Sequence, residues 1–171
     1  MTRPPATRAA SDDRDDEAFS NFVAARLPHL LKLGRALAGD EQHGADLVQD
    51  ALERTLLRWQ RIEDPDAFVR RCMVNRSVSV WRKVRREHPL TDLPEPTRSD
   101  RPRDHELLAA VRTLPPRQRA VIALRYYEDL TEAQTAEALG CSVGTVKSQA
   151  NRAMAALRVQ LPRFADLEGQ S

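Results

Sequence analysis

The chain has 171 residues, of which 41% are hydrophobic and 30% are charged, and its formal net charge is +2. This length and composition allow one or two small domains with modest aliphatic cores. No apolar run approaches the roughly 20 residues of a membrane-spanning helix, and the N-terminus lacks the apolar stretch of a secretory signal. Together these absences predict a cytoplasmic protein without membrane insertion.

Cys72 and Cys141 are too few for a disulfide framework and are expected to be small buried side chains.

The charged residues are unevenly distributed along the chain. Residues 40–53 contain five acidic side chains and no Lys or Arg, whereas residues 70–86 contain seven basic side chains and no acid. Opposite charges in neighbouring segments indicate surfaces for two partners, one of them a polyanion. Ionic pairing between the two segments is the alternative.

The hydrophobic residues recur at helical spacing, without the alternation of strands, so the fold is predicted to be all-α. Residues 1–16 are polar and charged and are expected to form a disordered tail. A first helix is predicted over about residues 16–37. A second helix is predicted over about residues 41–60, with Asp40 as the N-cap whose carboxylate accepts from free amide protons.

A third helix begins at Pro65 after the N-cap Asp64 and runs to about residue 86. The next segment, residues 87–104, has four prolines and no glycine, which predicts an extended, stiff linker. The predicted chain is a tail, a first small helical domain, the linker, a second small helical domain and a short tail, at residues 1–16, 17–86, 87–104, 105–162 and 163–171.

The second domain ends in a helix-turn-helix pattern. A short helix has a capping box of Thr131 with Gln134, stops at Gly140, and is followed by a helix with Ser142 as N-cap. Apolar residues fill one side of this last helix, and small polar or basic residues without any acid fill the other. Such side chains can reach base edges in the major groove. The expected contacts with duplex DNA are Ser142, Thr145, Lys147, Ser148, Gln149, Asn151 and Arg152. The alternative, a solvated face on a core helix, would normally include Glu.

One side of the third helix is a stripe of basic residues. Like charges at this spacing repel one another in a free helix, and a polyanion would neutralise them. The stripe consists of Arg71, Arg82, Arg85 and Arg86, and the neutral Asn75 lies on the same side of the helix. Trp59 and Phe68 lie close by in sequence and are able to stack on unpaired bases, although a core position is the more common use of such residues.

The sequence contains no pattern typical of an enzyme. It has no Gly-rich phosphate loop and no paired metal-ligand spacing, and its four histidines are scattered. These observations predict no catalytic site, no bound metal and no cofactor.

Three segments carry a resemblance to a known family: "DLVQDALERTLLRW", "VRRCMVNRSVSVWRKVRR" and "LPPRQRAVIALRYYEDLTEAQTAEALGCSVGTVKSQANRAMAALR". Over about residues 17–160, the chain resembles a bacterial RNA polymerase sigma factor of the sigma-70 family. The resemblance is to the extracytoplasmic-function (ECF) group, in a form common in actinobacteria. It implies that the two predicted domains are sigma region 2 and sigma region 4.

The resemblance implies that the protein directs promoter-specific transcription initiation as a partner of core RNA polymerase. Region 2 would bind the clamp helices of the largest subunit, and region 4 would reach the flap region. An anti-sigma factor is a further candidate partner. The residues implied at the polymerase surface are Asp46, Gln49, Asp50, Glu53 and Arg54.

The resemblance also assigns DNA elements to the two domains. Region 4 would read the -35 element with the seven residues of the last helix named above, and region 2 would bind and open the -10 element. The implied -10 residues are Trp59, Arg61, Asp64, Phe68, Arg71, Asn75, Arg82, Arg85 and Arg86. Many relatives have Arg and His where this chain has Gln149 and Asn151, which predicts a different base preference. The alternative function is a stand-alone helix-turn-helix regulator.

Overall fold

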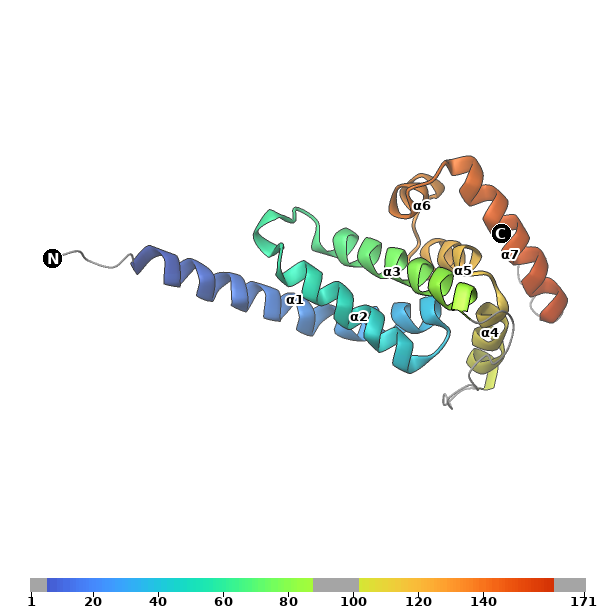
Figure 1. Ribbon diagram of the computed structural model, residues 1–171, viewed down its shortest axis with the longest axis horizontal. Helices are drawn as coiled ribbons and strands as arrows, with labels where there is room; N and C mark the ends of the chain where they lie inside the picture. The colour runs from blue at the N-terminus through green and yellow to red at the C-terminus, as the bar shows by residue number, and fades with distance from the viewer. Residues whose placement is uncertain (1–5, 88–101, 162–171) are drawn as a thin grey trace.

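A computed structural model describes residues 6–87 and 102–161, with side chains described for residues 14–80 and 106–161. Within these ranges the chain consists of helices and short connections without strands, which confirms the predicted all-α class (Figure 1). The elements are α1 (Ala6–Ala38), α2 (Glu41–Leu56), η1 (Trp59–Arg61), α3 (Pro65–Glu87), α4 (Pro102–Thr113), α5 (Pro116–Ile122), η2 (Ala123–Tyr127), α6 (Glu132–Leu139) and α7 (Val143–Gln160). Most of the predicted linker lies outside the described residues.

Helix α1 begins ten residues earlier than predicted, so the expected disordered tail is wrong for residues 6–16. The N-terminal part of α1 extends beyond the other helices (Figure 1). Contacts with the loop after α2 hold it there: the Trp59 ring packs on Phe19, with ring centroids 5.2 Å apart, and on Phe22 at 5.4 Å. The Gln60 side chain also donates to an Asp15 carboxylate oxygen at 2.7 Å. Composition alone does not reveal such long-range partners.

The largest hydrophobic core joins both predicted domains. Leu33 of α1, Val48 of α2 and Met73 of α3 are buried in it, and Ala120 and Leu124 from the second domain belong to the same cluster. Helix α3 lies between α1 and α2 on one side and α5 and α6 on the other (Figure 1). The sequence predicted two domains on a stiff linker, and the structure adds a shared core that holds them together.

Two smaller cores stabilise the second domain. Val111 of α4 and Leu114, which follows α4 directly, pack against Ala153 and Leu157 of α7. Val121 of α5 packs against Ala136 of α6 and Val146 of α7, and all three are buried. Each helix therefore contributes an apolar stripe at 3.6-residue spacing.

Helix boundaries in the second domain follow the predicted signals. Thr131 and Gln134 form a capping box, and Gly140 ends α6 in the left-handed conformation. The Ser142 hydroxyl caps α7 by accepting the Thr145 amide proton at 3.1 Å. Between α5 and α6, however, the helix widens into the π-helical turn η2, which local sequence patterns did not predict.

The guanidinium of Arg119 is a second link between the domains. It is buried and donates to the carbonyl oxygens of Leu37 and Ala38 at the end of α1, at 3.1 and 2.8 Å. It also donates to the carbonyl oxygens of Arg112 and Leu114 at 3.0 and 3.2 Å. One side chain thus satisfies the free carbonyl groups at two helix ends. None of the helices within the described ranges has the length and apolarity to cross a membrane.

Candidate nucleic-acid interface

Helix α7 separates its side chains as the sequence predicted. Val146, Ala153 and Leu157 are buried on one side. On the other side the predicted DNA-contact residues divide into two groups by exposure. Ser142, Lys147, Ser148, Asn151 and Arg152 are exposed, whereas Thr145 and Gln149 are half-buried. The hydroxyl of Ser142 already caps α7. At this helix end, Ser142 can therefore contact DNA only through its backbone.

Helix α3 presents part of the predicted basic stripe. Arg71 and Asn75 are exposed, and the Arg71 guanidinium lies 6.0 Å from the centroid of the half-buried Phe68 ring. Arg82, Arg85 and Arg86 fall on the same helix, but their side chains lie outside the described residues. Two neighbouring arginines have carboxylate partners. Arg76 pairs with Asp50 at 2.7 Å and Arg70 with Glu128 at 2.8 Å. The alternative of pairing between the acidic and basic segments therefore applies to Arg76.

The loop before α3 combines packing and exposed polar groups. Trp59 is half-buried against α1, so its ring has the packing role that was the alternative to base stacking. Arg61 is exposed on η1. Asp64 is the predicted N-cap of α3, since its carboxylate accepts the Ala67 amide proton at 3.0 Å. Among the interactions described, Trp59 packs on α1 and Asp64 caps α3, whereas the side chain of Arg61 has neither role.

Helix α2 carries the predicted polymerase surface on its outer side. Asp46, Gln49, Glu53 and Arg54 are exposed, and the Gln49 side chain donates to Glu53 at 3.1 Å. The inner side holds Val48 and Ala51, both buried. Asp50, at the boundary, reaches Arg76 on α3. Spacings of three and four residues therefore bring the acids of this segment together on one exposed face.

Comparison with known families identifies the chain. Residues 22–87 match the family "Sigma-70 region 2", and residues 104–157 match "Sigma-70, region 4". The chain belongs to the sigma-70 family of RNA polymerase sigma factors. Helices α1–α3 thus form region 2 of the sigma factor, and α4–α7 form region 4.

Individual relatives agree with this assignment. The sigma-E factor of Streptomyces coelicolor is 40% identical over 151 residues, which cover 84% of this chain and 85% of that protein. The ECF sigma factor EcfG of Rhodopseudomonas palustris is 30% identical over 155 residues, covering 85% of this chain and 86% of that protein. The chain therefore belongs to the ECF group, as the resemblance implied.

A solved structure has the same fold. The sigma factor RpoE from Bartonella quintana, determined in complex with the anti-sigma factor NepR, aligns with a TM-score of 0.70 at 24% identity, covering 85% of this chain and 98% of that one.

As a member of this family, the protein is a transcription initiation factor that binds core RNA polymerase and directs it to promoters. The alternative of a stand-alone helix-turn-helix regulator is not favoured, because it leaves the matched region 2 without a function. No group of three or more potential metal-ligating side chains gathers among the residues whose side chains are described.

Helices α3 and α7, which carry the predicted -10 and -35 residues, line one cavity. A cavity of about 110 Å³ separates the middle of α3 from the N-terminal half of α7. The residues that line it are Val74, Asn75, Val78, Ser79, Arg117, Val121, Leu139, Cys141, Thr145, Val146 and Gln149. It thus brings together a predicted -10 residue, Asn75, and two predicted -35 residues, Thr145 and Gln149.

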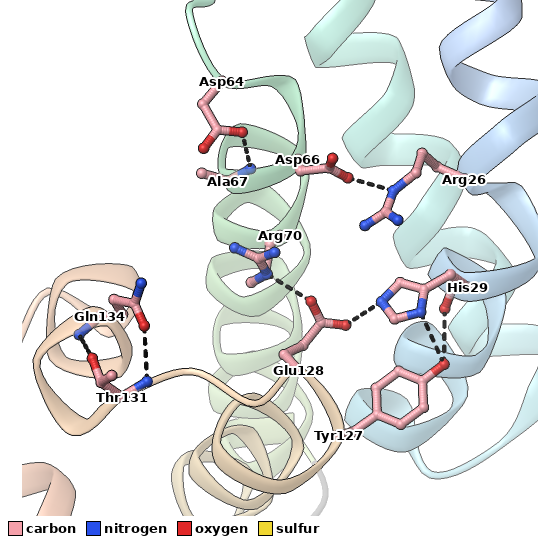
Figure 2. Close-up of polar contacts among 10 residues, drawn as sticks. All are labelled: Arg26, His29, Asp64, Asp66, Ala67, Arg70, Tyr127, Glu128, Thr131 and Gln134. Atoms are coloured by element: carbon pink, nitrogen blue, oxygen red, sulfur yellow. Dashed lines mark hydrogen bonds and ion pairs between the residues drawn. The ribbon is translucent and has the colours of Figure 1, made fainter.

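A polar cluster between the two regions was missed from the sequence. Glu128 accepts from Arg70 at 2.8 Å and lies 2.5 Å from Nε2 of His29, and its side chain is only 4% exposed (Figure 2). Tyr127 stacks on the His29 ring, with centroids 5.0 Å apart. Burial, followed by the charge of Glu128, raises the pKa of Tyr127. Because His29 and Glu128 are 99 residues apart, no local pattern could have paired them.

Proposed function

We propose that this sigma factor binds duplex DNA of the -35 element with α7 and the -10 element with α3 and the loop before it. The observation that carries the proposal is the exposed face of α7, where Lys147, Ser148, Asn151 and Arg152 are exposed without an acid among them. A capped helix with small polar and basic side chains fits the major groove closely. Ser142, Thr145 and Gln149 complete the proposed -35 surface.

The proposed -10 surface joins α3 to its preceding loop. Arg71 and Asn75 are exposed on α3, and Arg61 is exposed on η1, which supports contact with a polyanion. Opening the duplex requires no catalytic residue, since binding energy offsets unstacking, which costs a few kcal/mol per base step. We therefore infer that the sigma factor acts as a binding protein rather than as an enzyme. Trp59, Asp64, Phe68, Arg82, Arg85 and Arg86 complete the proposed surface.

The outer face of α2 is the proposed polymerase surface, made of Asp46, Gln49, Asp50, Glu53 and Arg54. Its exposed acids are suited to a basic partner surface on the largest-subunit clamp. Region 4 is proposed to reach the flap region. Since polymerase is the partner, the proposed place of action is the cytoplasm. An anti-sigma factor is a further proposed partner, by analogy with the RpoE–NepR complex.

Abortive initiation with purified core polymerase on a genomic promoter library tests the proposed function. The wild-type chain is expected to produce short transcripts from a subset of templates. Arg152→Ala should lower initiation on every productive template by about tenfold, because a specific Arg contact with DNA contributes roughly 1–3 kcal/mol. Arg158→Ala, which removes the same charge from α7 outside the proposed face, is the matched control and should have a smaller effect. Absence of template-dependent initiation by the wild-type chain would refute the proposal.

A further inference from the structure

The N-terminal arm of α1, residues 14–27, lies outside the part of the helix that is anchored in the core. None of its side chains is buried, whereas Leu30 and Leu33 further along α1 are buried. Pro28 stands between the two parts, and a proline has no amide proton for the helical hydrogen bond to the residue four positions earlier. The placement of the arm therefore depends on half-buried contacts with its neighbours.

The main neighbour of the arm is the -10 loop, residues 57–64. None of the three residues of η1 within this loop is buried, and Leu57 at its start is 84% exposed. The one aromatic ring of the loop, that of Trp59, lies edge-on to Phe19 with ring centroids 5.2 Å apart, and it packs on Phe22 at 5.4 Å. The -10 loop thus takes its packing from the arm.

An ion pair connects the arm to the far end of the -10 loop. Nε of Arg26 donates to Oδ1 of Asp66 at 2.6 Å, in the first turn of α3 (Figure 2). Phe19 and Arg26 are seven residues apart, which corresponds to about 10 Å along a helix axis. The arm therefore contacts the -10 loop near its start and α3 just beyond its end.

A hydrogen bond from Gln60 fixes the orientation of one exposed amide in the -10 loop. Nε2 of Gln60 donates to Oδ2 of Asp15 at 2.7 Å. An ionised carboxylate only accepts hydrogen bonds, so the amide has to turn its nitrogen toward the arm. The oxygen and the second N–H of this amide remain for another partner, and Gln60 is exposed beside the exposed Arg61.

An unpaired base is a suitable partner for the Gln60 amide. A planar side chain with a donor and an acceptor can hydrogen-bond to the edge of a base, and unstacked bases expose these edges. The neighbouring Arg61 supplies positive charge for the phosphate backbone. Because a side chain that is already ordered loses less entropy on binding, the Asp15 contact favours such recognition.

We propose that the N-terminal arm of α1 is a positioning element of the -10 site, in which the arm holds the -10 loop and Asp15 turns the Gln60 amide toward a base of the opened strand. The proposal rests on the proposed role of α3 and its preceding loop in -10 recognition. Gln60 joins the -10 surface as a base-contacting residue. Asp15, Phe19 and Phe22 are positioning residues, because they act through side chains of the loop.

Promoter selection by the holoenzyme, from a library randomised in the -10 and -35 elements, tests the roles of Gln60 and Asp15. Gln60→Ala should reduce the preference at one -10 position by about fivefold or more, as loss of a base contact does. Asp15→Ala should reduce it at the same position by about two- to tenfold, the effect of having to order one side chain on binding. Asp15→Glu keeps an acceptor-only group and should retain the preference, whereas Asp15→Asn permits either orientation of the Gln60 amide and should relax it.

Glu17→Ala is the matched control for promoter selection, because it removes an exposed acid from the same arm. It should select the wild-type -10 element. Asp15→Ala combined with Gln60→Ala should lose no more than Gln60→Ala alone, since Asp15 acts through Gln60. The -35 preference should be the same in all variants, which a general loss of folding would not allow.

Hydrogen exchange of the free sigma factor tests the arm without polymerase or promoter. The amide protons of Arg61 and Ile62 are hydrogen-bonded within the -10 loop, so their exchange reports its opening. Phe19→Ala should accelerate this exchange severalfold and leave α7 unchanged. Leu57→Ala, which truncates the exposed apolar side chain of the loop itself, is the matched control and should leave the exchange as in the wild type.

An unaltered -10 preference in Asp15→Ala or in Gln60→Ala would overturn the proposal, as would an equal change in Glu17→Ala. Unaltered exchange of the -10 loop in Phe19→Ala would also overturn it. If circular dichroism shows that Phe19→Ala loses helix content, Phe19→Leu is measured in its place and judged by the same result. A wild-type chain that selects no -10 element would refute the proposed function, whereas hydrogen exchange would still decide whether the arm holds the loop.

Discussion

Gly34 and Gly44 meet backbone to backbone where α1 crosses α2. A Cβ atom on Gly34 would lie 2.5 Å from the carbonyl oxygen of Gly44, and one on Gly44 would lie 2.6 Å from the backbone nitrogen of Arg35. Neither neighbour is a flexible side chain that could move aside. The close crossing brings Val48 against α1 and so determines how the outer face of α2 is presented.

Gly34→Ala is expected to destabilise the protein, because the added methyl group forces the two helices apart. Alanine gains about 1 kcal/mol of helix propensity over glycine, yet overpacking typically costs about 1–3 kcal/mol and should exceed it here, where the contact is backbone. Thermal unfolding followed by circular dichroism measures the effect. Gly144→Ala is the control, since its Cβ would meet only the Ser142 hydroxyl oxygen at 3.8 Å. A higher Tm for Gly34→Ala would show that the crossing is not tightly packed.

Arg119→Lys should destabilise the protein by about 2–4 kcal/mol in urea unfolding. A lysine keeps the charge but lacks the planar fork that reaches four carbonyl oxygens at once, and hydrogen bonds to charged groups contribute roughly 1.5–3 kcal/mol each. Burial lowers the pKa of the Arg119 guanidinium, which makes its hydrogen bonds to the carbonyl groups all the more necessary. Arg117→Lys, at an exposed position in the same helix, should change stability little. Equal effects of the two substitutions would contradict this role for Arg119.

Cys72 should be alkylated slowly at neutral pH. Burial raises the pKa of its thiol above the ordinary value of 9.0, although Arg54, Arg71 and Arg58 oppose the shift. The pKa of the Cys72 thiol is higher in the folded protein than in the unfolded chain, so folding favours the protonated thiol. This contribution to the free energy of unfolding is fully present below the unfolded pKa and is lost as pH rises through the folded pKa. In a Cys141→Ser variant, the pH profile of iodoacetamide reaction should have its midpoint above 9.0 when folded and shift down in urea. A midpoint below 9.0 in the folded protein would exclude the effect of burial.

Asp50→Arg combined with Glu53→Arg should weaken binding to core polymerase by at least about tenfold, because it reverses the charge of the proposed polymerase surface. Affinity measured with labelled sigma factor tests this. Asp50 also pairs with Arg76, so Arg76→Gln is needed to separate loss of that pair from loss of the surface. Normal binding by the double variant would place the polymerase contact elsewhere.

Gln149→Ala should relax promoter preference at one position of the -35 element and leave the -10 element unchanged. A base contact by a side chain on α7 contributes roughly 1–3 kcal/mol of discrimination. Selection of promoters from a randomised library, followed by sequencing, measures the preference at each position. Val159→Ala, at an exposed position beyond the proposed face, should select the same promoters as the wild type. An unaltered -35 profile in Gln149→Ala would remove this residue from the reading surface.

Most helix ends were predictable because their signals are local. Asp40, Asp64, Thr131 and Ser142 cap helices through hydrogen bonds to residues three positions away, as their sequence context indicated. The start of α1 at Ala6 was not predicted, because the polar and charged composition of residues 6–16 does not indicate a helix. The exposed face of α7 also followed from periodicity, as does any face set by 3.6-residue spacing.

The contact between the regions required the structure. No sequence pattern singles out Glu128, and His29 is one of four scattered histidines. Arg70 reads as one more member of a basic segment, and it is 58 residues from its partner. Pairing at such separations arises from the packing of whole helices, which sequence periodicity does not describe.

The shared core has a consequence for folding. Ala120, Ala123 and Leu124 belong to region 4 by sequence, yet they are buried together with Leu33, Val69 and Met73 of region 2. The two regions should therefore melt in a single cooperative transition of the free protein. Region 4 produced by itself would expose this apolar strip to water and become prone to aggregation. In this chain, each region buries apolar side chains of the other.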